Sequence, residues 1–301
     1  MARKELTQAI IEEWVSLAPA KFSVRDIWHE VGIESTEAKH HLRVILGRLD
    51  GKTVKATPDG LFHRLDGVAP KIQWHEANPD AYLPISFPFG LEEYVKIFPK
   101  SIIVIAGSKN AGKTGFLYNF INMNMGAYRI DLYNSETGPE QMKERFDLLS
   151  IPYPPPFETY ERYDNFAEII DPEHISVVDY LDFNSEVYLV GAEIDAIFRK
   201  LTKGVALLAL QKAPPGVTYV KGVKKIIPRD LGYGGAFSAK RSVLYLSMDS
   251  NRLKVVYAKT PKSPKLNPNN MTFKFKIEDG IHFTDIQRVY EQEDNYIGDE
   301  P

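Results

Sequence analysis

Eight consecutive residues, Gly107-Ser-Lys-Asn-Ala-Gly-Lys-Thr114, place two glycines, a lysine and a hydroxyl at a fixed spacing. The glycines let the backbone curl so that its N–H groups face an anion, and a following helix adds its positive N-terminal end. Lys113 is placed to reach the terminal phosphates of a nucleotide, and the Thr114 hydroxyl to bind Mg²⁺. An ordinary glycine turn is the alternative. We predict a nucleotide site formed by Gly107, Ser108, Lys109, Asn110, Ala111, Gly112, Lys113 and Thr114.

Two carboxylates are expected at the ends of strands that neighbour this loop. Glu136 follows an apolar run at 128–133, and Asp179 lies near the end of a run at 174–180. Glu136 could orient and deprotonate a water beyond the γ-phosphate, and Asp179 could complete the Mg²⁺ site with Thr114. Glu136 could instead be an acid favoured by the positive end of the next helix, and Asp179 could simply end a buried strand.

A polar residue and a basic segment follow the next apolar run, at 204–210. The Gln211 amide could hydrogen-bond the γ-phosphate or its water, or it could be a plain polar strand end. Residues 212–241 contain seven basic residues, one acid and several glycines. Such a loop can follow the phosphate backbone of single-stranded DNA, or it can be a solvated surface. The DNA-binding residues we predict are Lys212, Lys221, Lys224, Lys225 and Arg229.

Alternating strands and helices are needed to bring these residues together. Apolar runs predict strands at 101–106, 128–133, 174–180, 204–210, 242–248, 253–258 and 271–277. Helical patterns occur at 112–124, 138–148 and 187–201. This alternation is typical of an α/β domain with a mostly parallel sheet.

The N-terminal part, residues 1–66, has a different pattern. Three short helical patterns precede two strands around Pro58-Asp-Gly60, a strong turn signal. This order resembles a winged-helix domain, a small helix-turn-helix domain. Its basic and acidic residues are equal in number, so the segment could contact duplex DNA or dock a protein.

The remaining segments separate or end these parts. Residues 67–100 contain five prolines, which predicts a linker before an ATPase-sized domain at 101–290. Residues 291–301 contain five acids and no base, so we expect a disordered acidic tail.

Composition limits the classes of function. The chain has 301 residues, a formal net charge of −3 and no cysteine, so disulfide and thiolate chemistry are excluded. No apolar run reaches the length of a membrane span, and three glutamates interrupt the N-terminal apolar stretch, which argues against a signal peptide. A cytoplasmic location fits. With this charge, any nucleic-acid site must be a local patch.

The order of the motifs resembles the RecA-like ATPases, most closely the replicative hexameric helicases of the DnaB type. The match runs from about Gly90 to Phe275, and includes the segment from Glu136 to Arg145, Val178-Asp-Tyr-Leu181 and Leu208-Ala-Leu-Gln211. The resemblance implies ATP and Mg²⁺ as ligands and a homo-oligomer, a hexameric ring or a filament. It also implies Glu136 as the general base, Gln211 as a sensor and Arg145 near the adenine.

Two departures from this family bear on activity. The family carries a lysine and, two residues later, an arginine that reach the neighbouring subunit's γ-phosphate. Lys259 matches the lysine, but Pro261 stands at the arginine's place, and Lys262 is a substitute without the planar fork of arginine. The winged-helix-like segment also replaces the family's helical N-terminal domain.

We therefore expect a DNA-dependent ATPase that acts on single-stranded DNA, as a helicase or as a factor in replication or recombination. The catalytic residues expected are Lys113, Glu136, Gln211 and Lys259, the last contributed by a neighbouring subunit. The alternative is a regulator without motor activity, in which ATP binding switches assembly or the binding of DNA or a protein. A third class is an ATPase with a signalling role and no contact with nucleic acid.

Overall fold

The structure is a computed structural model that describes residues 6–65, 72–181, 189–212, 216–220, 223–227 and 229–289. It divides into two compact units, Met1–Ala77 and Asn78–Pro301. Of the sequence-based assignments, the acidic tail at 291–301 and Lys221 lie outside the described residues. No helix in the described ranges is long and apolar enough to cross a membrane.

The first unit contains the three predicted helices and the predicted hairpin. Its elements are α1 (Gln8–Leu17), β1 (Lys21–Phe22), α2 (Val24–Val31), α3 (Thr36–Leu49), β2 (Val54–Ala56), β3 (Phe62–Arg64) and the short 3₁₀ helix η1 (Trp74–Glu76). The three strands form an antiparallel sheet in the order β1-β3-β2. Strand β1 was not expected from the sequence, because two residues carry no period.

Local signals in the sequence set the ends of these helices. The Ser23 hydroxyl accepts from the Asp26 backbone N–H while the Asp26 carboxylate accepts from the Ser23 N–H, which is a capping box for α2. Gly32 ends α2 with a φ of 73°, a left-handed conformation that favours glycine. Ser35 caps α3, whose residues Leu42, Ile45, Leu46 and Leu49 are buried together in the core of this unit.

The second unit alternates strands and helices. Its elements are η2 (Pro88–Glu93), β4 (Ser101–Gly107), α4 (Lys113–Asn124), β5 (Ile130–Asn134), α5 (Pro139–Leu148), β6 (Glu158–Glu161), α6 (Phe166–Ile169), β7 (Ile175–Leu181), α7 (Leu189–Lys200), β8 (Val205–Gln211), β9 (Gly216–Val220), β10 (Val223–Ile227), η3 (Gly235–Phe237), β11 (Ser242–Asp249), β12 (Arg252–Ala258), β13 (Thr272–Glu278) and β14 (His282–Val289). The sequence did not predict β6, β14 or the β9–β10 pair.

Nine of these strands form one sheet in the order β14-β13-β12-β11-β4-β8-β7-β5-β6. The pairs from β11 to β6 are parallel, and β12, β13 and β14 are added antiparallel. The predicted α/β fold with a mostly parallel sheet is confirmed. The strand before the P-loop, β4, lies inside the sheet and all seven of its residues are buried, as the resemblance to RecA-like ATPases implies.

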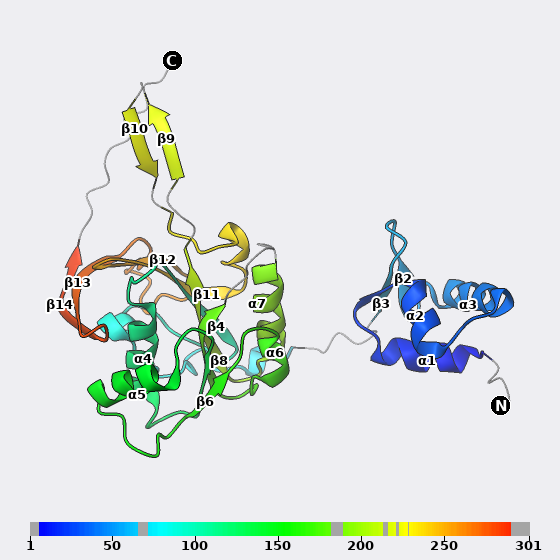
Figure 1. Ribbon diagram of the computed structural model, residues 1–301, viewed down its shortest axis with the longest axis horizontal. Helices are drawn as coiled ribbons and strands as arrows, with labels where there is room; N and C mark the ends of the chain where they lie inside the picture. The colour runs from blue at the N-terminus through cyan, green and yellow to red at the C-terminus, as the bar shows by residue number, and fades with distance from the viewer. Residues whose placement is uncertain are drawn as a thin grey trace. The chain divides into compact units, whose positions relative to one another are not determined.

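Helices cover both faces of this sheet (Figure 1). Ile103 and Ile105 of β4 pack in the cluster that contains residues of α4 and α5. Ile102 and Val104 pack in the cluster that contains residues of α6 and α7. Since successive side chains of a strand point to opposite faces, one continuous apolar run supplies both cores.

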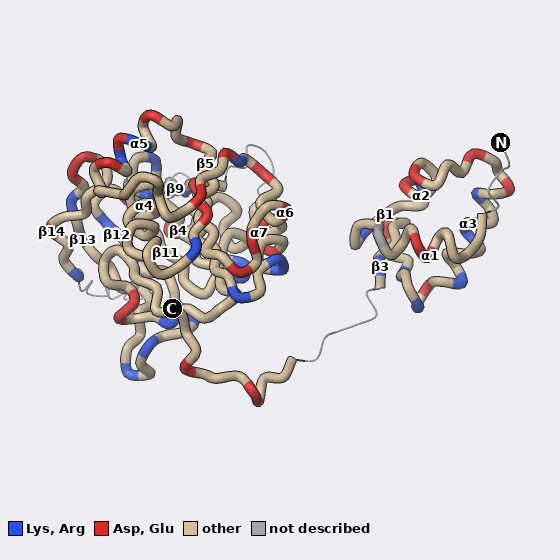
Figure 2. Tube along the Cα trace, turned by 90° about the horizontal axis from the view of Figure 1, so that it is seen from below, with Lys and Arg blue, Asp and Glu red and all other residues tan. Residues whose placement is uncertain are grey.

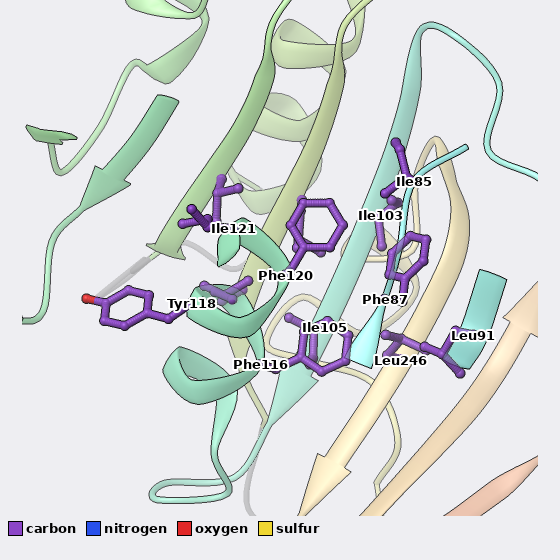
Figure 3. Close-up of a cluster of buried hydrophobic side chains, with 14 of the residues drawn as sticks. Ile85, Phe87, Leu91, Ile103, Ile105, Phe116, Tyr118, Phe120, Ile121 and Leu246 are labelled. Atoms are coloured by element: carbon purple, nitrogen blue, oxygen red, sulfur yellow. The ribbon is translucent and has the colours of Figure 1, made fainter. Parts of the chain in front are cut away.

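Part of the predicted linker belongs to the second unit. Residues 78–100 were assigned to a linker because of their prolines, but Ile85, Phe87 and Leu91 are buried beside β4 and α4 (Figure 3). The rings of Phe87 and Phe120 lie 5.3 Å apart, centre to centre. The linker assignment is therefore wrong for 78–100, because the apolar residues between the prolines fill the core.

The surface charge has no single sign. Figure 2 shows Lys and Arg residues interspersed with Asp and Glu residues along both units. This distribution agrees with the small net charge of −3. Any binding of a polyanion must therefore depend on a local group of residues.

Candidate nucleotide site

The predicted phosphate loop joins the end of β4 to the start of α4. Gly107 is the last residue of β4 and Lys113 is the first residue of α4. Gly112, between them, has a φ of 99°, which a residue with a Cβ rarely adopts. The first turn of α4 therefore presents its free backbone N–H groups at the edge where β4 ends, as anion binding requires.

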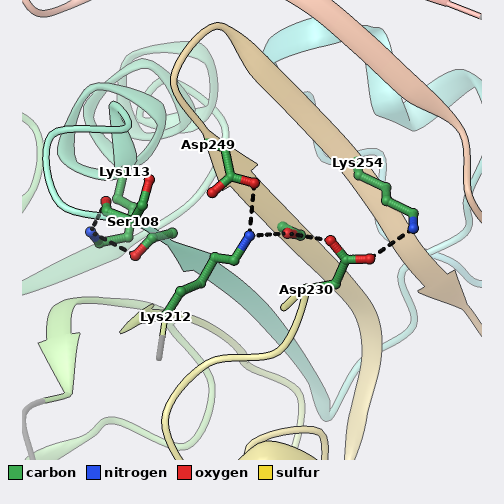
Figure 4. Close-up of polar contacts among 8 residues, drawn as sticks. Ser108, Lys113, Lys212, Asp230, Asp249 and Lys254 are labelled. Atoms are coloured by element: carbon green, nitrogen blue, oxygen red, sulfur yellow. Dashed lines mark hydrogen bonds and ion pairs between the residues drawn. The ribbon is translucent and has the colours of Figure 1, made fainter. Parts of the chain in front are cut away.

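The Lys113 side chain runs across Gly107 and turns back to the loop. Its Nζ donates to the carbonyl oxygens of Gly107 at 3.4 Å and Ser108 at 3.1 Å (Figure 4). A Cβ at position 107 would lie 2.6 Å from Lys113 Cγ, so this lysine requires a glycine beneath it. Burial lowers the pKa of the Lys113 amine, while the charges of Glu136 and Asp179 favour its protonated form.

Asp179 reaches the same edge from β7. It is fully buried, and neither carboxylate oxygen has a hydrogen-bond partner among the described residues. Burial raises the pKa of Asp179 to about 6, although the nearby Thr114 hydroxyl and Lys113 favour the charged form. A buried carboxylate without a partner is costly unless a cation or a donor joins it.

Thr114 and Asp179 fit the predicted Mg²⁺ site. Mg²⁺ is commonly held by one or two carboxylates together with substrate phosphates, and needs no cage of protein ligands. In agreement, no group of three or more His, Asp or Glu residues is gathered as a metal site within the described ranges. The unpartnered oxygens of Asp179 next to the Thr114 hydroxyl supply the oxygen donors that this ion prefers.

Glu136 stands on a turn that the sheet holds firmly. The Asn134 side chain bonds the backbone N–H and carbonyl of Thr137, the residue after this acid, at 3.1 and 2.7 Å. The Ser135 hydroxyl donates to the Tyr180 carbonyl on β7 at 2.9 Å. Glu136 itself is exposed and lines the same cavity as Lys113. Its position just before α5 does not exclude the helix-dipole interpretation.

These residues line one cavity of about 590 Å³. From the predicted site it takes Asn110, Ala111, Gly112, Lys113, Thr114, Glu136 and Arg145. The sequence analysis missed the other residues of its lining, which are Gly115, Thr137, Gln141, Ser250, Asn251, Ile277 and Gly280. A cavity of this size is in the range of small-molecule sites.

The β13–β14 hairpin forms a wall of the cavity that was not expected from the sequence. A Cβ at Gly112 would lie 2.6 Å from Ile277 Cδ1, and a Cβ at Gly115 would lie 3.1 Å from the Gly280 carbonyl oxygen. The Asn119 amide of α4 donates to the Ile281 carbonyl at 2.7 Å. The turn Asp279-Gly280 was visible as a signal, but only the sheet order places it over the P-loop.

Gln211 and Lys259 lie at different edges of the sheet. Gln211 ends β8 opposite Gly107, so it stands at the P-loop edge, but it does not line the cavity. Lys259 follows β12, which runs antiparallel to β11, and its backbone N–H donates to the Val243 carbonyl at the opposite edge. Its side chain is exposed. Lys259 therefore does not reach the P-loop of its own chain.

The position of Lys262 bears on its role as a substitute for arginine. Pro261 pairs with Val95 in an isolated bridge. The Lys262 amine donates to the Glu92 carbonyl oxygen of its own chain at 3.2 Å. Lys262 is thus held against the second unit's own surface, on the side of the sheet where Lys259 also lies.

The structure corrects one of the predicted DNA-binding residues. Lys212 is buried, and its amine is bonded to Ser247 and Asp249, so it is not available to a phosphate backbone. Arg229 is exposed. Lys224 belongs with Lys225 to strand β10, which pairs antiparallel with β9. Basic residue type alone did not separate an internal ion pair from a surface group.

Comparisons with known proteins complete the description. No family model matches the chain, and no curated protein matches it. Among solved structures, the chain is similar to the RadB recombinase, with 12% identity, a TM-score of 0.42, and coverage of 64% of this chain and 94% of that one. It is also similar to the ATPase domain of a DnaB-like protein, with 13% identity, a TM-score of 0.47, and coverage of 69% of this chain and 94% of that one.

Proposed function

We propose that the chain is an ATP hydrolase of the RecA-like P-loop class whose turnover depends on single-stranded DNA. The observation that supports this best is the meeting of Lys113, Thr114, Asp179 and Glu136 at one edge of the sheet, around a cavity of about 590 Å³. Four side chains from three strand ends supply a phosphate cation, two Mg²⁺ ligands and a base. An ordinary glycine turn needs none of the other three.

In this proposal, hydrolysis is an in-line attack of water on the γ-phosphorus of ATP. Glu136 accepts a hydrogen bond from that water, orients it and takes its proton as the bond to phosphorus forms. Lys113 faces the β- and γ-phosphate oxygens and offsets the charge that moves onto them and onto the leaving ADP. The backbone N–H groups of the loop and of the first turn of α4 hold the β-phosphate in place.

Thr114 and Asp179 would hold Mg²⁺, which supplies neutralisation of phosphate charge when bound. Thr114 is available for this role because it lies in the first turn of α4, directly after Lys113. Asp179 stays fixed there because β7 is buried on both faces. Arg145 and the two turns that contain Asn251 and Gly280 are proposed to surround the base and sugar, since they line the same cavity.

The substrate proposal is tested by the rate of ATP hydrolysis with and without single-stranded DNA. We expect DNA to raise the rate, because the segment after β8 begins beside the P-loop. An ATPase of the same rate at every DNA concentration would contradict the dependence on DNA. It would favour the regulator, in which ATP switches assembly or partner binding, an interpretation that Pro261 at the place of the family's arginine also supports.

We further propose that the active site is completed by a second copy of the chain. Lys259 is exposed at the edge of the sheet opposite to its own P-loop, so it can act only on another subunit's nucleotide. Lys259→Ala should then keep nucleotide binding and lose most turnover. Mixing it with Lys113→Ala should restore part of the activity, because mixed interfaces contain one intact P-loop and one intact lysine.

Size measurement with a non-hydrolysable ATP analogue accompanies the mixing experiment. A ring or filament is expected to form in the presence of the analogue, since the nucleotide would lie between subunits. A monomer with a concentration-independent specific rate, and no recovery on mixing, would refute the shared site while leaving the ATPase proposal intact.

For the first unit we propose contact with duplex DNA through α3. This helix buries one face and leaves His40, His41, Arg43 and Arg48 exposed on the other. Exposed cations on such a helix can contact base edges and phosphates in a groove. Arg43→Ala with Arg48→Ala should weaken duplex binding. Unchanged duplex binding would instead assign this unit to a protein partner.

A further inference from the structure

A buried group of charges stands at the base of the β9–β10 hairpin, outside the catalytic residues. Lys212 directly follows β8, and its side chain is only 5% exposed. Its Nζ donates to Ser247 Oγ at 2.9 Å and to Asp249 Oδ2 at 2.8 Å, both on β11 (Figure 4). A lysine this deep must be fully paired, because an unpaired buried charge is strongly unfavourable.

The same group continues to the other end of the hairpin segment. Ser247 Oγ donates to Asp230 Oδ1 at 3.2 Å, and Lys254 Nζ of β12 donates to Asp230 Oδ2 at 2.7 Å. Burial alone would raise the pKa of Asp230, but the hydrogen bond and charge of Lys254, with Lys212, hold that pKa below its usual value. Asp230 is therefore an anion held between two cations.

Backbone contacts close the segment at the same place. Lys212 pairs with Gly232 in an antiparallel bridge, and the Tyr233 N–H donates to the Gln211 carbonyl at 2.8 Å. A Cβ at Gly232 would lie 3.0 Å from Leu210 Cβ, so only glycine allows this close approach. The chain thus leaves the sheet after Lys212 and returns to it at Asp230 and Gly232.

This closure point is also bonded to the nucleotide edge. The Lys212 backbone N–H donates to the Gly107 carbonyl at 2.9 Å, and the Ser108 N–H of the P-loop donates to the Met248 carbonyl at 3.1 Å. Asp249, which binds the Lys212 amine, directly precedes Ser250 and Asn251, and these two line the cavity. One strand end therefore contacts both the hairpin base and the nucleotide cavity.

Stability alone does not explain such a group. Replacing buried ion pairs with apolar residues of similar volume is often neutral or stabilising, so their net contribution to stability is small. Their hydrogen bonds, in contrast, allow few geometries, because each acceptor faces one fixed donor. A group of this kind fixes the positions of the elements it joins.

We propose that Lys212, Asp230, Asp249 and Lys254 form a positioning network that holds both ends of the hairpin segment against the nucleotide edge and carries the effect of bound nucleotide to that segment. This proposal rests on the proposed DNA-dependent ATPase. Its consequence is that the network acts through the hairpin: it touches neither the phosphates nor the DNA, but without it DNA no longer stimulates hydrolysis.

Lys254→Met is the first test, since Lys254 lies on β12, outside the segment, and reaches only its far end through Asp230. We expect ATP hydrolysis without DNA to be unchanged and the stimulation by single-stranded DNA to fall by about fivefold or more, the lower end of coupling between sites. Lys203→Met, which removes the exposed pair with Glu173 at 3.2 Å, is the matched control and should keep full stimulation.

Lys212→Met separates positioning from direct contact with DNA. Loss of a phosphate contact on a single strand lowers the slope of log affinity against log salt by about 0.7. The network proposal expects the slope to stay at the wild-type value while stimulation is lost. A lower slope together with normal stimulation per bound DNA would make Lys212 a DNA contact and would overturn the network. Thermal unfolding identifies a variant that fails to fold, and the Lys254 result then decides.

A readout without DNA distinguishes failure of this proposal from failure of the proposed function. Trypsin cleavage at the lysines of the hairpin segment is followed by mass spectrometry with and without a non-hydrolysable ATP analogue. Wild type should show a nucleotide-dependent cleavage rate, and Lys254→Met should not. If DNA never stimulates the wild type, the proposed function fails; if cleavage responds to nucleotide equally in both proteins, the network proposal fails.

Discussion

The nucleotide edge and the hairpin segment lie side by side but are built in different ways. At the nucleotide edge, Gly107 and Gly112 are required by contacts within a few residues of chain or with one packed hairpin. At the hairpin base, Lys212 and Asp230 are held by residues of β11 and β12 that are 17 to 37 positions away. Backbone shape makes the first region, and long-range charge pairing makes the second.

The difference suggests that the two regions fail separately. A change at the nucleotide edge should affect hydrolysis whether or not DNA is present. A change in the hairpin segment should affect only what DNA adds. The following variants test that separation, beginning with the largest expected effect.

Lys113→Ala should remove hydrolysis both with and without DNA, and should weaken nucleotide binding. The loss of one preorganised donor to the reacting phosphate costs about 10²–10³-fold in rate, and this residue also contributes ground-state binding. Turnover and nucleotide titration provide the measurement. Lys143→Ala is the control, because its exposed amine pairs with Asp147 on α5 and does not line the cavity. Full turnover in Lys113→Ala would mean that the site lies elsewhere.

Glu136→Gln should keep ATP bound and slow hydrolysis by about 10²–10⁴-fold, the usual contribution of a general base. The amide keeps the shape of the side chain and loses the base. Nucleotide binding is measured by titration and hydrolysis in a single turnover. Loss of binding as well as rate would show that this acid has a structural role at the start of α5.

Gly107→Ala sharpens the claim that backbone shape makes the nucleotide edge. Its new Cβ would meet Lys113 Cγ at 2.6 Å, so the lysine must move. We expect a cost of about 1–3 kcal/mol, typical of overpacking, seen as weaker nucleotide binding. Gly126→Ala, where a Cβ meets nothing within 4 Å, should bind normally. Equal binding by both variants would remove the steric argument.

The smallest effect is expected from Lys221→Ala, Lys224→Ala and Lys225→Ala combined. If these lysines of the hairpin segment contact DNA, the triple variant should bind single-stranded DNA more weakly, with a salt slope reduced by about 0.7 for each lost contact. ATP hydrolysis without DNA should not change. Wild-type affinity and slope in the variant would make the hairpin a plain surface element and would end the functional separation of the two regions.

Several parts of the molecule were determined by the sequence alone. The Gly107–Thr114 motif, the caps Ser23 and Ser35, and the fully apolar β4 run report local geometry, since each depends on neighbours within a few residues. Asp179 and Glu136 could be named because parallel strands end at one edge. That regularity turns positions in the chain into positions in space.

Tertiary structure decided the rest. Prolines suggested a linker at 78–100, yet Phe87 is buried against Phe120, because burial of apolar area outweighs the weak preference of proline for extended segments. The Ile277–Gly280 wall depends on where β13 and β14 join the sheet. In the sequence Lys212 is one more cation of a basic segment, and only folding brings Asp249 to its amine, since a charge pair across strands leaves no period in the sequence.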